Sequence, residues 1–217
     1  MKVIIGKELL CANADQAAQN RELFRRRGAA VINIISSPGS GKTALLERTA
    51  KLMCGRFKTG VIVGDLYTDR DARRLKSAGA AAVQINTDGL CHLTAGMVAR
   101  AFKEIEPENP DLLFIENVGN LVCPAAFDLG EHVKVALLSV AEGADKPAKY
   151  PGIFREAAVT VISKADLVPY TDFDLPSCLA ELQQLNGKME VFVTSARTGE
   201  GLAKWCRWLD DLRQKLK

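Results

Sequence analysis

The chain has 217 residues, 47% of them hydrophobic, and a formal net charge of +3. This length suits one hydrophobic core, and we predict a single domain over residues 1–217. The basic residues are scattered apart from Arg25–Arg27, so no nucleic acid partner is indicated. The absence of an apolar run of about 20 residues and of a hydrophobic leader predicts no membrane span and a cytoplasmic location. Six cysteines in such a chain indicate buried thiols or metal ligands rather than disulfides.

Apolar runs and helical segments alternate along the chain after a helical lead-in over residues 1–28. Strands are predicted at Val31–Ile35, Val61–Gly64, Ala81–Ile85, Asp111–Glu116, Val133–Val140, Ala158–Ser163 and Val191–Thr194. Helices are predicted at Ala14–Arg27, Thr43–Met53, Asp71–Ala78, Leu93–Ile105 and Leu202–Leu216, with helical or loop segments around Ile153–Ala157 and Leu175–Leu185. This alternation is typical of an α/β fold with a mostly parallel sheet and helices on both faces. Functional groups should then line the carboxyl ends of the strands.

The stretch Val31–Arg48 runs from an apolar strand through a glycine-rich turn into a helix. Five consecutive residues match the end of the Walker A motif, namely Gly39, Ser40, Gly41, Lys42 and Thr43. In that motif backbone N–H groups surround phosphates, the lysine reaches the β/γ oxygens and the hydroxyl binds Mg²⁺. Ser36 replaces the first glycine of the motif, but the strand before the turn and the helix formers from Ala44 onward favour a phosphate-binding loop over an ordinary turn. We therefore predict a P-loop NTPase in which residues 39–44 bind the nucleotide.

Two further strand ends carry acidic residues. Asp65 follows a short buried strand and is placed to hold Mg²⁺ through a water; the alternative is a helix-initiating turn with Asp69 and Asp71. Glu116 and Gly119 form an ExxG sequence, where a loop that senses the γ-phosphate begins and the glycine lets a backbone N–H approach the phosphate. The candidate catalytic residues are Lys42, Asp65 and Glu116.

Two later strand ends resemble the guanine-reading elements of GTPases. In the first, Asp166 is expected to accept hydrogen bonds from guanine while the stem of Lys164 packs on the ring; Ser163 replaces the usual asparagine. The second element consists of Ser195, Ala196 and Arg197, whose alanine N–H would meet guanine O6. Either element alone also fits an ordinary polar loop, but two at successive strand ends favour GTP.

The sequence also predicts a candidate metal-binding site beside the nucleotide site. Cys91 and His92 stand at the start of a predicted helix, and Cys123 follows Gly119 by four residues. Thiolate and imidazole suit Ni²⁺, Zn²⁺ or copper ions, and a helix N-terminus lowers the pKa of a thiol. A buried-thiol interpretation competes, but Cys123 lies in the loop expected to move with the γ-phosphate. The remaining cysteines are assigned to the core, namely Cys11, Cys54, Cys178 and Cys206.

Taken together, several stretches resemble the HypB family of GTPases, which assist nickel insertion into nickel–iron hydrogenase. They span most of the chain from residue 30 onward: NIISSPGSGKTALLE, VGD, QINTDGLCHLTAGM, LFIENVGNLVCPAAFDLGE, LLSVAEGADKPAKYP and TSARTGEGL. The resemblance implies a GTPase that uses GTP, GDP and Mg²⁺ and forms a homodimer on GTP binding. It also implies a Ni²⁺ or Zn²⁺ site of Cys91, His92 and Cys123 at the subunit interface. A hydrogenase maturation partner and the hydrogenase large subunit are the implied protein partners.

The chain departs from that family in two places. Residues 1–29 contain only Cys11 and no histidine, which argues against nickel storage. Downstream of Cys91 the sequence offers no fourth histidine ligand, and we expect His132 to be a surface residue. Two alternatives stay open: a urease-type nickel GTPase, which should carry a Cys-Pro-His motif that this sequence lacks, and a P-loop small-molecule kinase, which would need ATP and an acceptor pocket. Because no water-orienting glutamine follows Glu116, intrinsic GTP hydrolysis should be slow, below about 10⁻² s⁻¹.

Overall fold

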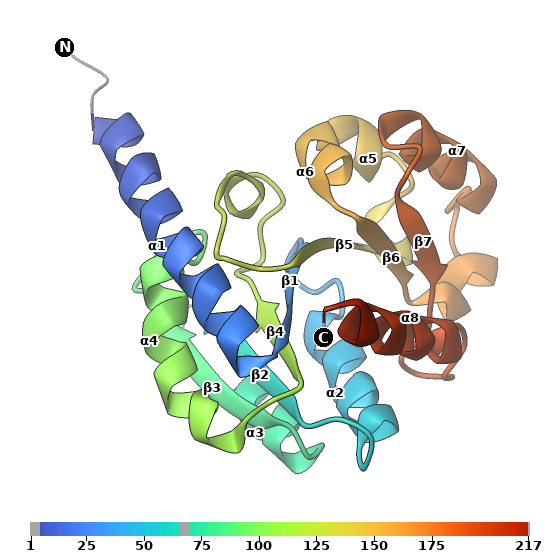
Figure 1. Cartoon of the computed structure of the whole chain (residues 1–217). Helices are drawn as coiled ribbons and strands as arrows, with labels where there is room; N and C mark the ends of the chain where they lie inside the picture. The colour runs from blue at the N-terminus through green and yellow to red at the C-terminus, as the bar shows by residue number, and fades with distance from the viewer. Residues whose placement is uncertain (1–4, 66–69, 217) are drawn as a thin grey trace.

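Seven strands form one sheet at the centre of the computed structural model (Figure 1). They are β1 (Ala30–Ser36), β2 (Thr59–Asp65), β3 (Ala81–Asn86), β4 (Leu112–Glu116), β5 (Val133–Ser139), β6 (Val159–Ser163) and β7 (Glu190–Val193). Every pairing in the order β3-β2-β4-β1-β5-β6-β7 is parallel. The structure describes residues 5–65 and 70–216, and the side chains of residues 5–10 and of Asp65 are outside this description.

Helices connect the strands and cover both faces of the sheet (Figure 1). The α-helices are α1 (Ile5–Arg27), α2 (Lys42–Met53), α3 (Arg70–Ser77), α4 (Ala95–Ile105), α5 (Lys146–Lys149), α6 (Pro151–Glu156), α7 (Leu175–Leu185) and α8 (Leu202–Lys215). Short 3-10 helices are η1 (Glu106–Glu108), η2 (Cys123–Ala126), η3 (Val140–Glu142) and η4 (Ala165–Tyr170). Within the described ranges, no helix has the length and apolar character needed to cross a membrane.

Alternate residues of β1 enter separate parts of the core. Ile32 and Ile34 pack with residues of α2, α3 and α8 on one face, including the fully buried Trp205. On the other face, Val31 packs with α1 and α4, and Ile35 packs with α6 and α7. Because both faces are covered, the central strands are apolar on both sides, which explains the continuous apolar runs in the sequence. The predicted α/β architecture is confirmed.

Candidate nucleotide and metal sites

The loop between β1 and α2 borders a cavity of about 390 Å³. Gly39 and Gly41 have φ angles of 71° and 99°, in the left-handed region that glycine adopts without steric cost. Helix α2 begins at Lys42, and its first N–H groups have no partner within the helix, which makes this end suited to an anion. The same cavity is lined by Thr43 and Ala44 and, from the neighbouring strand end, by Glu116.

Ser36, the exception to the Walker A pattern, is a hydrogen-bond partner of the loop lysine. Its buried hydroxyl accepts hydrogen bonds from Lys42 Nζ at 2.8 Å and from Ser40 Oγ. Lys42 Nζ also donates to the Ser37 carbonyl at 3.4 Å, so the ammonium group folds back on its own loop. Phosphate oxygens are stronger acceptors for this group because they are charged. The sequence motif alone did not reveal this role of Ser36, because the contact depends on how the loop closes on itself.

Glu116 lies buried at the end of β4, beside the phosphate-binding loop. Its Oε1 accepts a hydrogen bond from Thr43 Oγ1 at 2.7 Å, and its Oε2 is buried without a hydrogen-bond partner among the described residues. Burial raises the pKa of Glu116 to about 7, although Lys42 and Thr43 act in the opposite direction. An open carboxylate oxygen next to a threonine hydroxyl fits the oxygen ligands that Mg²⁺ prefers.

Asp65 is the second acidic candidate for this site, and the alternative for it is a helix-initiating turn with Asp69 and Asp71. Asp65 ends β2, where its backbone pairs with Asn86 of β3, but its side chain is outside the described part of the chain, as is Asp69. Asp71 lies in the first turn of α3 and lines the cavity. The Mg²⁺ role of Asp65 therefore stays a prediction.

Gly119 lies directly against the phosphate-binding loop. A Cβ atom at this position would lie 2.8 Å from Pro38 Cγ and 2.9 Å from the backbone nitrogen and Cα of Pro38. Such distances are too short for real side chains, so only glycine permits this contact. The segment that follows Glu116 is thus packed on the loop that borders the cavity.

The first guanine-reading element is hydrogen-bonded to the phosphate-binding loop. The Ser163 hydroxyl donates to the Ser40 carbonyl at 2.6 Å, and Lys164 Nζ donates to the Gly39 carbonyl at 2.8 Å. Lys164 has a φ of 57°, an uncommon conformation for a residue with a side chain. Ser163 therefore joins the two loops. The sequence had left open what a serine does in place of the usual asparagine.

The second guanine-reading element, Ser195–Arg197, lies next to Asp166 of the first. Ser195 Oγ donates to Asp166 Oδ1 at 2.5 Å, and Arg197 Nη1 lies 3.8 Å from Asp166 Oδ2. The two loops also share a backbone hydrogen bond, from Ala165 N to the Thr194 carbonyl at 3.0 Å. The structure thus brings the two predicted elements together, with Ala196 half-buried between Ser195 and the exposed Arg197.

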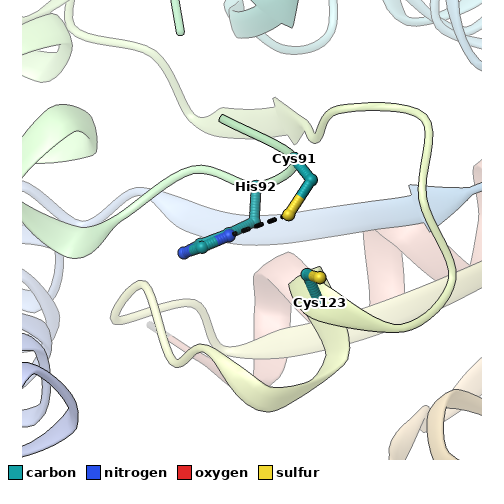
Figure 2. Close-up of side chains that lie close together, drawn as sticks. All are labelled: Cys91, His92 and Cys123. Atoms are coloured by element: carbon teal, nitrogen blue, oxygen red, sulfur yellow. Dashed lines mark hydrogen bonds between the residues drawn. The ribbon is translucent and has the colours of Figure 1, made fainter. Parts of the chain in front are cut away.

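Cys91, His92 and Cys123 form a cluster whose possible ligand atoms all lie within 4.8 Å of one another. Figure 2 shows Cys91 and His92 on one segment and Cys123 on a neighbouring turn. Cys91 Sγ lies 3.6 Å from His92 Nδ1, and the His92 ring stacks on Phe127 with a centroid distance of 3.8 Å. Two thiols and an imidazole are a suitable ligand set for Ni²⁺ or Zn²⁺.

The nucleotide-binding architecture has counterparts in known proteins. The family model described as "CobW/HypB/UreG, nucleotide-binding domain" matches residues 30–193. Hydrogenase maturation factor HypB of Azotobacter chroococcum mcd 1 is 49% identical over 211 residues, which are 97% of this chain and 69% of that protein. The chain belongs to the HypB family.

Two HypB crystal structures share the fold. HypB from Helicobacter pylori in complex with nickel has a TM-score of 0.90 and 40% identity, covering 94% of this chain and 96% of that one. HypB from Archaeoglobus fulgidus has a TM-score of 0.88 and 37% identity, covering 94% of this chain and 100% of that one. The resemblance inferred from the sequence and the P-loop NTPase fold are both confirmed, and residues 30–193 form a nucleotide-binding domain.

Within this HypB-family structure, the helix predicted from Leu93 starts two residues later, so Cys91 and His92 do not lie at a helix N-terminus. Helix α4 begins at Ala95, because the Thr94 hydroxyl accepts a hydrogen bond from Met97 N and caps the helix there. Cys91 therefore precedes the helix, and its thiol pKa is raised, first by the hydrogen bond with Cys123 and then by burial. Burial lowers the pKa of His92, which favours the neutral imidazole that binds metals.

The other cysteines and the second histidine also differ from expectation. Cys178 and Cys206 are buried as predicted, but Cys11 and Cys54 are exposed. Cys54 lies just beyond the last residue of α2, where the apolar pattern no longer implies burial. His132 is half-buried instead of free at the surface, because its Nδ1 accepts a hydrogen bond from Val31 N at 3.0 Å.

Proposed function

We propose that this HypB-family chain is a GTP-hydrolysing metallochaperone that assists nickel insertion into nickel–iron hydrogenase. One observation carries the proposal: β4 ends in Glu116 at the nucleotide cavity, and the connection that follows contributes Gly119 to the same cavity and Cys123 to the metal cluster. The segment that borders the nucleotide cavity therefore also holds a metal ligand. The nickel complex of the H. pylori relative supports Ni²⁺ as the cargo, with Zn²⁺ as the second candidate.

Guanine selectivity in this proposal rests on Asp166, which Ser195 and Arg197 orient. The Ser163 and Lys164 contacts to the phosphate-binding loop support a rigid base site, so we propose that GTP binds at least about tenfold more tightly than ATP, or about 1.4 kcal/mol. Equal affinity for ATP would favour the small-molecule kinase.

For hydrolysis, we propose that Lys42 exchanges its contacts with Ser36 and Ser37 for phosphate oxygens. Thr43, Glu116 and, through a water, Asp65 would hold Mg²⁺, which neutralises phosphate charge when bound. Turnover is slow, below about 10⁻² s⁻¹, because the segment after Glu116 supplies no glutamine to orient water.

Among the described residues, the metal cluster offers three ligands, whereas closed zinc sites have four. The apolar side chains next to it, Leu90 and Val122, are 45% and 61% exposed. Both features support a homodimer formed on GTP binding, in which two copies place their clusters together. The hydrogenase large subunit and a maturation partner would receive or supply the ion.

The single sheet that contains every described strand supports one domain over residues 1–217. The cytoplasmic location stays a prediction from the sequence.

The deciding experiment measures Ni²⁺ and Zn²⁺ affinity in the GDP-bound and GTP-analogue-bound forms. We expect the two nucleotide states to differ by about fivefold to 150-fold, the usual range for coupled sites. Cys123→Ala should weaken metal binding, whereas Cys54→Ala, which removes an exposed thiol elsewhere, should not. Equal affinities in both states, or unchanged affinity in Cys123→Ala, would refute the coupling.

A further inference from the structure

A line of buried polar side chains runs from Asn117, which lines the nucleotide cavity, through Asn33 to Glu131. Asn117 Nδ2 donates to Asn33 Oδ1 at 3.2 Å, and Asn33 Nδ2 donates to Glu131 Oε1 at 3.1 Å. Glu131 Oε2 in turn accepts a hydrogen bond from Leu129 N at 2.7 Å. Asn117 and Asn33 have no exposed surface, so each contact is costly to leave unmade.

Asn117 is the member of this line that reaches both functional segments. Its Oδ1 accepts hydrogen bonds from Val118 N at 3.0 Å and from Leu93 N at 3.2 Å. Val118 lies next to Gly119, which packs on the phosphate-binding loop, and Leu93 directly follows the metal-cluster residue His92. One oxygen atom therefore joins two segments that are 24 residues apart in the sequence.

The side chain of Leu93 packs against Gly64 of β2. It is fully buried, and a Cβ atom at Gly64 would lie 2.9 Å from Leu93 Cγ and Cδ1. Gly64 precedes Asp65, the candidate Mg²⁺ residue. The backbone of Leu93 can thus follow Asn117 only by small shifts in this packing, which would carry His92 with it.

We propose that Asn117 is a positioning residue that transmits movement of the nucleotide loop to His92. The inference rests on the proposed function, in which metal and nucleotide are coupled. Cys123 belongs to the same segment as Gly119 and moves with it through the chain, but His92 lies on a separate segment. If the backbone at Val118 shifts with the nucleotide state, the buried Asn117 oxygen either draws Leu93 N along or loses one of its two donors.

Three variants test this role by isothermal titration of Ni²⁺ into the GDP-bound and GTP-analogue-bound forms. Asn117→Ala removes the shared oxygen, so the ratio of the two Ni²⁺ affinities should fall to near one. Because Asn117 also lines the nucleotide cavity, the nucleotide affinity of each variant is measured without metal, and Ni²⁺ is titrated only into forms saturated with nucleotide. Asn117→Asp keeps an acceptor for both N–H groups but loses the amide that donates to Asn33, so it should retain more of the ratio than Asn117→Ala does. Asn33→Ala is the matched control, because it removes a buried amide from the same line without touching Leu93.

The outcomes separate this inference from the function on which it rests. If the parent shows no difference between nucleotide states, the coupling in the proposed function fails and the role of Asn117 fails with it. If the parent is coupled and Asn117→Ala is coupled equally, only the role of Asn117 is overturned. An equal loss in Asn33→Ala and Asn117→Ala would also overturn it, since the effect would then be general loosening of the core. Should Asn117→Ala not fold, loss of the ratio in folded Asn117→Asp, with Asn33→Ala unaffected, overturns it as well.

Discussion

Proton release from Glu116 should accompany the binding of Mg²⁺ and nucleotide. The carboxyl group is buried, and its pKa of about 7 in the nucleotide-free protein leaves it half-protonated near neutral pH. A divalent cation at Oε2 would favour the carboxylate strongly, so the bound state should hold the group ionised. Binding should therefore be weaker at low pH, where the proton must first be displaced.

The size of the effect follows from the pKa. A group with a pKa of about 7 is about 0.9 protonated at pH 6 and about 0.1 protonated at pH 8. The affinity for Mg²⁺-GDP should then rise by about tenfold from pH 6 to pH 8, or about 1.4 kcal/mol. The same raised pKa also stabilises the free folded protein below pH 4.5, and this contribution is lost as pH rises through 7, because the folded state binds the proton more tightly than the unfolded chain.

Calorimetry of Mg²⁺-GDP binding in buffers of different ionisation enthalpy measures both the affinity and the protons released. Glu116→Gln is the control, since it keeps the acceptor for Thr43 but cannot titrate, and the nucleotide's own protonation affects both proteins alike. The tenfold pH dependence should appear in the parent and be absent from the variant. An identical pH dependence in the two proteins would refute the assignment of the proton to Glu116.

Three other substitutions test the nucleotide site. Lys42→Ala should lower GTP hydrolysis by at least about 100-fold, measured as phosphate release, because the charge at the transferred phosphate is lost; an unchanged rate would contradict the site. Asp166→Asn should shift preference from GTP toward xanthosine triphosphate, and competition binding with the same base ranking as the parent would exclude Asp166 as the base reader. Gly119→Ala should weaken binding of a GTP analogue, since its Cβ would overlap Pro38, whereas Gly152→Ala has open space and should bind normally.

The architecture was accessible from the sequence because its signals are local. The start of α2 after the glycine turn was predicted within one residue of the observed Lys42, and the ends of β4 and β6 at Glu116 and Ser163 were predicted correctly. Apolar runs and glycine turns are properties of a few consecutive residues. The start of α4 was predicted two residues too early, at Leu93, although Thr94 is a frequent type of N-cap residue and offered a usable signal.

The contacts that position the functional groups were not accessible in the same way. Ser36 with Lys42, Asn117 with Leu93, and Phe127 with His92 each depend on how a loop closes or on which segments meet. No sequence spacing encodes the pairing of an asparagine oxygen with a backbone N–H 24 residues away. These contacts decide how the site responds to a ligand. The sequence therefore indicates which functional groups are present more readily than how the nucleotide and metal sites are coupled.

The character of the metal cluster agrees with transport of an ion more than with its permanent retention. A structural site closes four ligands around the metal and keeps their thiolates away from water. Here the described part of the chain offers three ligands, Cys91 is exposed, and the hydrogen bond with Cys123 raises the pKa of its thiol. Binding of the metal ion must displace the thiol proton. In the proposed homodimer, loss of the ligands from the partner copy would leave the ion under-coordinated. An ion bound in this way can pass to a partner that offers a complete ligand set, provided that the loops carrying His92 and Cys123 move apart when the nucleotide changes.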